Sequence, residues 1–268
     1  MMTRPVTTAR NVDWRERRPP RPMLLLEARA PLELGALLWS APWLMTAAPR
    51  GDGHPVLVLP ALNRDDGATM FLRAFLAGCG HAVHGWGLGR NLGRWGVVDA
   101  HLVPMLERLH RQSGRRVSVI GWSMGGLYAR RLARRRPDLV RSIVMMGSPF
   151  GCRLSATNAW WEFELLSGRD ADHAPAAGTM RAPPVPRTSI YSRSDAIVPW
   201  RCCVEADAPH AENVEVESSH FGLVHHPAAL YAVTDRLAQP EDGWRRFDQR
   251  ALHRLMYPRT AAPAAVSL

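Results

Sequence analysis

The chain has 268 residues, of which 46% are hydrophobic and 22% charged, a balance that places it among soluble globular proteins and excludes fibrous and disordered classes. Its formal net charge of +10 comes from 34 basic residues that are all arginine, and the densest group, between positions 130 and 136, has the helical spacing of a solvated face. We therefore expect no nucleic-acid partner, and a surface that attracts anionic substrates or lipid headgroups is the alternative.

The first 48 residues form two stretches of different composition. Residues 1–22 combine arginines with prolines and show no apolar periodicity, so we expect a loosely ordered basic tail. Residues 23–48 are apolar, but Glu27, Arg29 and Glu33 interrupt the run, which argues against both a secretion signal and a membrane-spanning helix. We therefore expect a cytoplasmic protein, with export as the alternative.

Within this apolar stretch, the spacing predicts an amphipathic helix from Pro31 to about Trp39 that packs on the edge of the core. The alternative is that Trp39, Trp43, Leu44 and Met45 lean toward the mouth of a functional site. In both cases the segment belongs to the folded domain, which we expect to begin near residue 23.

Six short apolar segments have the character of buried strands. The first does not alternate between apolar and polar residues, which indicates burial on both faces of a sheet. Helices or long crossovers separate the segments, and parallel neighbours require such crossovers. We therefore predict an α/β fold with a six-stranded parallel sheet and helices on both faces. The predicted strands are 56–59, 82–85, 117–120, 143–146, 189–191 and 214–216, and the main predicted helices are 69–77, 98–109, the helix after residue 123, and 227–237.

A glycine-rich loop with the sequence GWGLGRNLG spans residues 85–93. Its glycines are spaced as in a dinucleotide fingerprint, but the next helical pattern begins only near Val97 and the acidic residue that this fingerprint requires is missing. We therefore interpret the loop as a rigid rim of the functional site, with Arg90 and Asn91 as its supports.

The stretch VSVIGWSMGGLY, residues 117–128, joins an apolar strand to a helix through the pattern Gly-Trp-Ser-Met-Gly. In this pattern the serine lies on a strained strand-to-helix turn, and glycine at the flanking positions lets neighbouring backbone pass closely. Ser123 is therefore predicted to be an accessible nucleophile. A purely structural turn is the alternative, because so short a pattern also occurs by chance.

Two polar residues follow later predicted strands in the order that completes a serine-based site. Asp195 lies in SDAIVP after the strand at 189–191, and His220 lies in SHFGL after the strand at 214–216. A serine hydroxyl needs a base within hydrogen-bond reach, so His220 is the predicted base and Asp195 is the residue that orients it. The competing candidates do not directly follow a strand in this order; they are His210, His225, His226, Asp170, Asp172 and Asp207.

With these motifs the chain resembles the α/β-hydrolase superfamily, specifically its compact lipase and esterase branch, over roughly residues 55–237. The resemblance implies the α/β-hydrolase fold, catalysis by Ser123, Asp195 and His220, and an acyl-enzyme intermediate formed without a cofactor. The order of the three residues along the chain, serine first, then acid, then histidine, is the order that this fold uses.

The resemblance also implies an oxyanion hole, formed by the backbone N–H groups of Met124 and Leu62. In lipases of this type, the loop before the second donor carries a glycine. This chain has Ala61 there, and its Cβ narrows the backbone conformations available to the loop. Ala61 therefore raises the question of whether the oxyanion hole supports full activity.

The segment 151–187 lies where this fold takes insertions, and we predict a short cap over the site; the alternative is that its aromatic residues pack on the sheet edge. The hydrolase domain then extends over 23–238. Residues 239–268 form a C-terminal tail with one further predicted helix, 244–255. The predicted substrate contacts are Trp122, Trp160, Trp161, Phe163 and Phe221.

The four cysteines do not form a disulfide framework for a chain of this length, and two of them are adjacent, so we expect reduced thiols. No CxxC or HExxH spacing is present, and we expect neither a metal ion nor a cofactor. The cysteines are Cys79, Cys152, Cys202 and Cys203.

The sequence as a whole predicts a serine hydrolase that cleaves carboxylic esters of a small hydrophobic substrate. An acyltransferase or thioesterase with the same triad is one alternative, because the acyl acceptor depends on how water is excluded from the site. A non-catalytic binding protein that keeps the fold is the other, motivated by Ala61. A membrane surface is a conceivable partner that the sequence does not indicate, and no oligomeric state is predicted.

Overall fold

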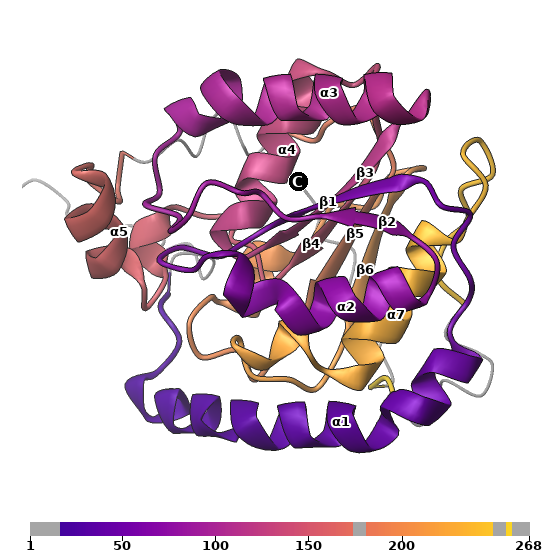
Figure 1. The fold of residues 1–268 in the computed structure, drawn as a ribbon. Helices are drawn as coiled ribbons and strands as arrows, with labels where there is room; N and C mark the ends of the chain where they lie inside the picture. The colour runs from indigo at the N-terminus through magenta and orange to yellow at the C-terminus, as the bar shows by residue number, and fades with distance from the viewer. Residues whose placement is uncertain (1–16, 174–180, 249–255, 259–268) are drawn as a thin grey trace, which may run out of the picture.

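The computed structural model describes residues 17–173, 181–248 and 256–258, and its centre is a six-stranded parallel sheet (Figure 1). The strand order is β2-β1-β3-β4-β5-β6, and every neighbouring pair is parallel. This sheet confirms the predicted fold class, although three strands begin two or three residues earlier than expected. The strands are β1 (Pro55–Leu59), β2 (Ala82–His84), β3 (Val117–Trp122), β4 (Val140–Met146), β5 (Arg187–Tyr191) and β6 (Ala211–Glu215).

Helices cover both faces of the sheet (Figure 1). Helices α3 and α4 lie on one face, α2 and α7 lie on the other, and α1 packs outside α7 as a further layer. The long helices are α1 (Ala30–Ala47), α2 (Met70–Gly78), α3 (Val103–Ser113), α4 (Met124–Arg135), α5 (Trp160–Ser167) and α7 (Pro227–Leu237). Shorter or tighter helical segments are η2 (Arg21–Arg29), η3 (Asp66–Thr69), η4 (Val98–Leu102), η5 (Leu154–Ala156), η6 (Trp200–Cys203) and η7 (Gly222–Val224).

The core consists of two apolar layers, one on each side of the sheet. All six residues of β3 are buried, and its side chains pack alternately into the two layers, with Val119 in one and Ile120 in the other. Burial on both faces explains why the strands lack polar alternation. Because the strands are parallel, the carboxyl ends of β3, β5 and β6 lie at the same edge of the sheet. The predicted functional residues lie in the loops that follow these ends.

The N-terminal helical segment is longer than the sequence predicted. It begins with η2 at Arg21 and continues through α1 to Ala47, whereas the expected helix covered Pro31 to Trp39. The Trp39 side chain is 89% exposed, and Trp43 is exposed as well, whereas Leu44 is buried. Within the described residues, no helix is both long enough and apolar enough to cross a membrane.

Parts of three predicted segments lie outside the described residues. These are 1–16 of the expected basic tail, 174–180 of the expected cap, and 249–255 and 259–268 of the expected C-terminal tail, where 249–255 belong to its predicted helix. The first residues of that expected helix, 244–248, are described and are not helical.

Candidate active site

The turn between β3 and α4 holds a single residue, Ser123, in a strained conformation. Its φ is 52° and its ψ is −116°, a region that side-chain-bearing residues seldom occupy. Glycine is required on both sides of it, because a Cβ on Gly121 would lie 2.3 Å from the Gly125 carbonyl oxygen, and a Cβ on Gly125 would lie 2.3 Å from the Leu59 carbonyl oxygen. The surrounding backbone therefore packs so closely that it holds the Ser123 side chain at the end of the strand.

The side chains of Asp195 and His220 meet on the loops that follow β5 and β6. His220 Nδ1 lies 2.6 Å from Asp195 Oδ2, and each residue is only 2% exposed. The other carboxylate oxygen, Asp195 Oδ1, accepts hydrogen bonds from the N–H groups of Ile197 at 2.9 Å and Val198 at 2.8 Å. Two backbone donors thus fix the carboxylate in the orientation that faces the histidine ring.

The electrostatic environment favours the protonated form of His220. Burial opposes this by disfavouring the charged ring, but the negative charge of Asp195 and its hydrogen bond outweigh burial, and Glu27 adds to them. The net result is a pKa for His220 above its ordinary value. A ring with this property accepts a proton readily from a neighbouring hydroxyl.

Ser123 follows β3 and His220 follows β6, at the same edge of the sheet, but no hydrogen bond among the described residues joins Ser123 Oγ to the ring. Such contacts are often long in enzymes without bound substrate. The competing histidines have other neighbours: His225 Nε2 lies 3.0 Å from the Ala30 carbonyl oxygen, and the His210 ring packs against Trp244. Of the histidines considered, His220 is thus the one that lies against Asp195.

Two backbone N–H groups near the elbow are left without partners among the described residues. They belong to Met124, the first residue of α4, and to Leu62, in the loop after β1. Neither donates a hydrogen bond, which is the condition required of oxyanion donors. The loop tolerates Ala61 because the positive φ of 57° falls two residues later, on Asn63, a residue type that accepts this conformation.

Asn91, which is fully buried, supports the loop that carries Leu62. The Asn91 side chain donates to the Pro60 carbonyl oxygen at 2.9 Å, and its own oxygen accepts from Gly93 N–H and from the Tyr128 hydroxyl. Arg90 also hydrogen-bonds to Asn63 Oδ1. These contacts agree with the supporting role predicted for Arg90 and Asn91.

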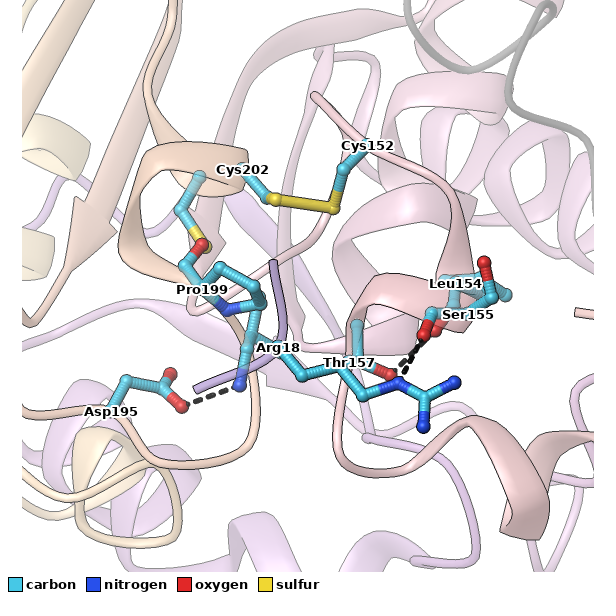
Figure 2. Close-up of a disulfide and its surroundings, with 10 residues drawn as sticks. Arg18, Cys152, Leu154, Ser155, Thr157, Asp195, Pro199 and Cys202 are labelled. Carbon is cyan, nitrogen blue, oxygen red and sulfur yellow. Dashed lines mark hydrogen bonds between the residues drawn. A yellow bond between two sulfur atoms is a disulfide. The ribbon is translucent and has the colours of Figure 1, made fainter. Parts of the chain in front are cut away.

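A disulfide joins Cys152, in the loop after β4, to Cys202 in η6, and it corrects the expectation of four reduced thiols (Figure 2). The two Cα atoms lie 5.3 Å apart although the residues are 50 positions apart in sequence, so no local spacing could reveal the pair. The bond lies beside the Asp195 turn, as Figure 2 shows. Cys79 and Cys203 are free and buried.

The aromatic residues predicted to contact substrate differ in exposure. Trp122 and Phe163 are buried, and Trp122 Nε1 donates to the His220 carbonyl oxygen at 3.2 Å. Phe221 is partly buried, and its ring lies edge-on to the His220 ring with 5.8 Å between centroids. The other two lie on α5, where Trp160 is partly buried and Trp161 is exposed. Substrate contact remains a prediction for all five.

Two acidic residues of the N-terminal segment reach the same loops, and sequence reasoning missed them. Glu27 of η2 accepts hydrogen bonds from backbone N–H groups in both the Asp195 turn and the His220 turn. Glu33 of α1 accepts from Ser219 N–H at 2.8 Å and from the Ser219 hydroxyl. Their sequence signal was present as isolated charges within an apolar run, but it was interpreted only as an interruption of that run.

A second Asp-His-Ser set lies at the opposite, amino end of the strands, and in this set the histidine is hydrogen-bonded to both of the other side chains. His54 Nδ1 lies 2.6 Å from Asp52 Oδ1, and His54 Nε2 lies 3.0 Å from Ser118 Oγ. Ser118 is 1% exposed and His54 is completely buried, so a substrate cannot reach this serine. Burial therefore separates the two sets: His54 is hydrogen-bonded to both Asp52 and the inaccessible Ser118, whereas His220 is hydrogen-bonded to Asp195.

This buried histidine gives a prediction for the pH dependence of stability. Burial lowers the pKa of His54 to about 4, against an ordinary value of 6.5, although its hydrogen bond to Asp52 opposes the shift. Between these values the unfolded chain binds a proton that the folded chain does not, so stability falls as the pH is lowered. Across this window we expect His54 to cost about 3 kcal/mol. Urea unfolding at pH 7 and pH 4 should therefore show a smaller pH effect in His54→Gln than in the wild type; equal effects would contradict the assignment.

The parallel sheet, the strained elbow and the paired acid and histidine together are the features of the α/β-hydrolase fold. The sequence matches the family described as alpha/beta hydrolase fold over residues 78–172, a stretch that contains the elbow but neither Asp195 nor His220. The fold is similar to that of Aspergillus fumigatus lipase B, with a TM-score of 0.56 and 18% identity, covering 75% of this chain and 57% of that one. It is also similar to that of Bacillus licheniformis lipase BlEst2, with a TM-score of 0.52 and 14% identity, covering 71% and 94%.

Among curated proteins, the chain is similar to a pimeloyl-[acyl-carrier protein] methyl ester esterase of Yersinia pseudotuberculosis. The two are 30% identical over 91 residues, which covers 25% of this chain and 34% of the relative. The match thus spans about a third of the length of that relative. The methyl ester esterase activity in that name belongs to the relative.

Proposed function

We propose that the chain is a serine hydrolase that cleaves carboxylic esters through an acyl-enzyme intermediate on Ser123. The observation that carries this proposal is the buried Asp195–His220 pair at the sheet edge where the strained elbow presents Ser123. In the second Asp-His-Ser set, by contrast, burial closes off Ser118. The lipase and esterase names of several similar proteins agree with this reaction class.

The proposed reaction uses each residue in a defined role. His220 Nε2 accepts the proton of Ser123 as Oγ attacks the ester carbonyl carbon, and the Asp195 carboxylate stabilises the resulting imidazolium. The N–H groups of Met124 and Leu62 stabilise the negative charge on the former carbonyl oxygen. His220 then donates the proton to the leaving alcohol, and the same steps with water release the acid and regenerate Ser123.

The proposed substrate is a small hydrophobic ester. Phe221 supports this choice because its ring lies beside the His220 ring and is only partly buried. An acyltransferase or a thioesterase would use the same first half of the reaction and would differ in the acceptor or in the leaving group. Product analysis with an aryl ester, in water and with an added alcohol, separates transfer from hydrolysis.

A fluorophosphonate probe tests the proposed nucleophile directly. Such probes react with an activated serine, so we expect peptide mapping of the wild-type protein to locate the label on Ser123. A panel of aryl esters with increasing acyl length should be cleaved by the same preparation. If the protein neither labels nor cleaves any ester of the panel, the non-catalytic binding protein replaces the hydrolase as the preferred function. Ala61→Gly would then test whether the oxyanion loop is the cause.

The cytoplasmic location expected from the sequence also remains a proposal. The Cys152–Cys202 disulfide is the observation that opposes it, because disulfides are rare in reducing compartments. Mass spectrometry after alkylation of free thiols, on protein prepared without reductant, distinguishes two modified cysteines from four.

A further inference from the structure

The carboxylate of Glu27 bridges the two loops that carry the proposed acid and base. Glu27 Oε1 accepts hydrogen bonds from Ala196 N–H and from His220 N–H, each at 3.0 Å. Its second oxygen accepts from Phe221 N–H at 3.2 Å. Ala196 directly follows Asp195 in the chain, so this one side chain, from a helix about 170 to 190 positions away in sequence, holds both turns at their functional ends.

We propose that Glu27 is a positioning residue of the active site, which fixes the Asp195 turn against the His220 turn and supplies a second negative charge near the histidine. The inference rests on the proposed ester hydrolysis. Hydrogen bonds from N–H groups to a carboxylate are stronger than those to neutral acceptors, and here three of them converge on one group. A displacement of about 1 Å in such a site can cost roughly 100-fold in rate.

The charges around His220 come from three elements. Asp195 faces the ring from the turn after β5, and Glu27 faces it from η2; both favour its protonated form. Arg64, in the loop after β1, opposes them, and its guanidinium lies 5.3 Å from the centroid of the Phe221 ring. Removing the charge of Glu27 therefore leaves the histidine a weaker base.

Glu27→Gln tests this role because it keeps the shape of the side chain and removes its charge. We expect kcat for an aryl ester to fall about 10- to 100-fold with little change in KM. The acid limb of the kcat/KM profile should also move to lower pH, because the pKa of His220 falls when a nearby negative charge is lost. The position of this limb does not depend on how much of the variant is folded, so it separates a positioning role from simple loss of stability.

Glu217→Gln is the matched control, since Glu217 is an exposed acid on the same loop as His220. It should leave both kcat and the acid limb unchanged. If the wild type cleaves esters and Glu27→Gln matches it in rate and in profile, the positioning role is wrong while the hydrolase stands. If the wild type neither labels with the probe nor cleaves esters, the proposed function itself fails.

The outer face of the same N-terminal segment supports a second, independent inference. Every exposed side chain between Pro22 and Ala47 is uncharged, and the three charged residues of this stretch all bond inward, to the loops or to each other. The exposed face includes five large apolar side chains, with exposures from 57% to 89%: Leu25, Leu32, Leu38, Trp39 and Trp43. Exposed arginines flank it at positions 17, 18 and 21 on one side and at 50 on the other.

We infer that this face docks on an anionic lipid bilayer, lying in the plane of its surface. Interfacial helices bury leucine and tryptophan side chains at the level of the headgroups, and flanking basic residues add attraction to anionic lipid. The net charge of +10 favours this occupant over a second copy of the chain, because two such bodies repel each other.

Sedimentation with vesicles of phosphatidylglycerol and phosphatidylcholine in equal parts tests this docking. The full chain should sediment with these vesicles, and much less with pure phosphatidylcholine or at high salt. Replacing both tryptophans, Trp39→Ser with Trp43→Ser, should weaken binding at least about tenfold. Met70→Ser, at an exposed apolar position on α2, should leave it unchanged.

Three outcomes would overturn the docking inference. The chain could stay in solution with anionic vesicles, or it could bind them equally well with and without the two tryptophans. Light scattering could also show a dimer that the double substitution dissociates, in which case the face is an interface between two copies.

Discussion

Replacing Ser123 with alanine is expected to lower kcat/KM for an aryl ester by at least about 10⁴-fold. The substitution removes Ser123 Oγ, the proposed nucleophile, so the proposed oxyanion donors, the N–H groups of Met124 and Leu62, are left to stabilise only a direct attack by water. Alanine differs from serine only by the missing hydroxyl, so the backbone strain at this position is unchanged and the variant should fold. Initial rates over the ester panel, together with probe labelling, measure the effect.

Ser118→Ala is the matched control for this experiment, since both serines belong to β3 or its end and Ser118 is hydrogen-bonded to His54 in the second Asp-His-Ser set. Ser118 is buried and hydrogen-bonds to His54, so its loss should lower stability by about 1 kcal/mol and leave probe labelling of Ser123 intact. Residual ester cleavage by Ser123→Ala at a rate close to that of the wild type would show that Ser123 is not the nucleophile.

The fold was predictable because its main signals are local. Buried parallel strands read as continuous apolar runs, and β3 has no exposed residue. The elbow is equally local, since the contacts that demand glycine join Gly121 and Gly125 to backbone within a few residues or on the adjacent strand. Asp195 and His220 each follow a predicted parallel strand, so both could be assigned to the same sheet edge as Ser123. That assignment required no knowledge of the side chains between the strands.

The missed features all depend on contacts between distant parts of the chain. Glu27 meets the His220 turn over a separation of 193 positions, and no sequence period reports such a contact. Cys152 and Cys202 likewise approach each other only because the loop after β4 folds against η6. The length of the N-terminal helix was underestimated for a related reason. Its carboxylates, Glu27 and Glu33, accept hydrogen bonds from loops much further along the chain rather than from solvent.

Ala61 replaces the glycine expected in the oxyanion loop, and neighbouring residues compensate for this difference. The sequence pattern raised doubt about the oxyanion loop, because the expected glycine is missing. In the structure Asn63 takes the positive φ, while Asn91 ties the loop to Pro60 through a buried hydrogen bond. The unpaired N–H of Leu62 is thus held by a different set of residues from the one that the pattern suggested.

Replacing Asp195 with asparagine is expected to lower kcat/KM by about 10⁴-fold while leaving the protein folded. The N–H groups of Ile197 and Val198 both donate to Asp195 Oδ1, so an asparagine must place its carbonyl oxygen there. Its NH₂ group then faces His220 Nδ1 and can only donate to it. The ring is forced into the tautomer that carries its proton on Nε2, and that nitrogen can no longer accept the proton of Ser123.

The tautomer argument makes the loss specific to this carboxylate. Probe labelling of Ser123 should slow in parallel with ester cleavage, because both reactions need the same proton acceptor. Asp170→Asn is the control, since Asp170 is an exposed competing acid whose side chain hydrogen-bonds to His173 rather than to His220. It should leave both rates unchanged. If Asp195→Asn retains the wild-type rate, or if Asp170→Asn abolishes it, Asp195 is not the residue that orients the base.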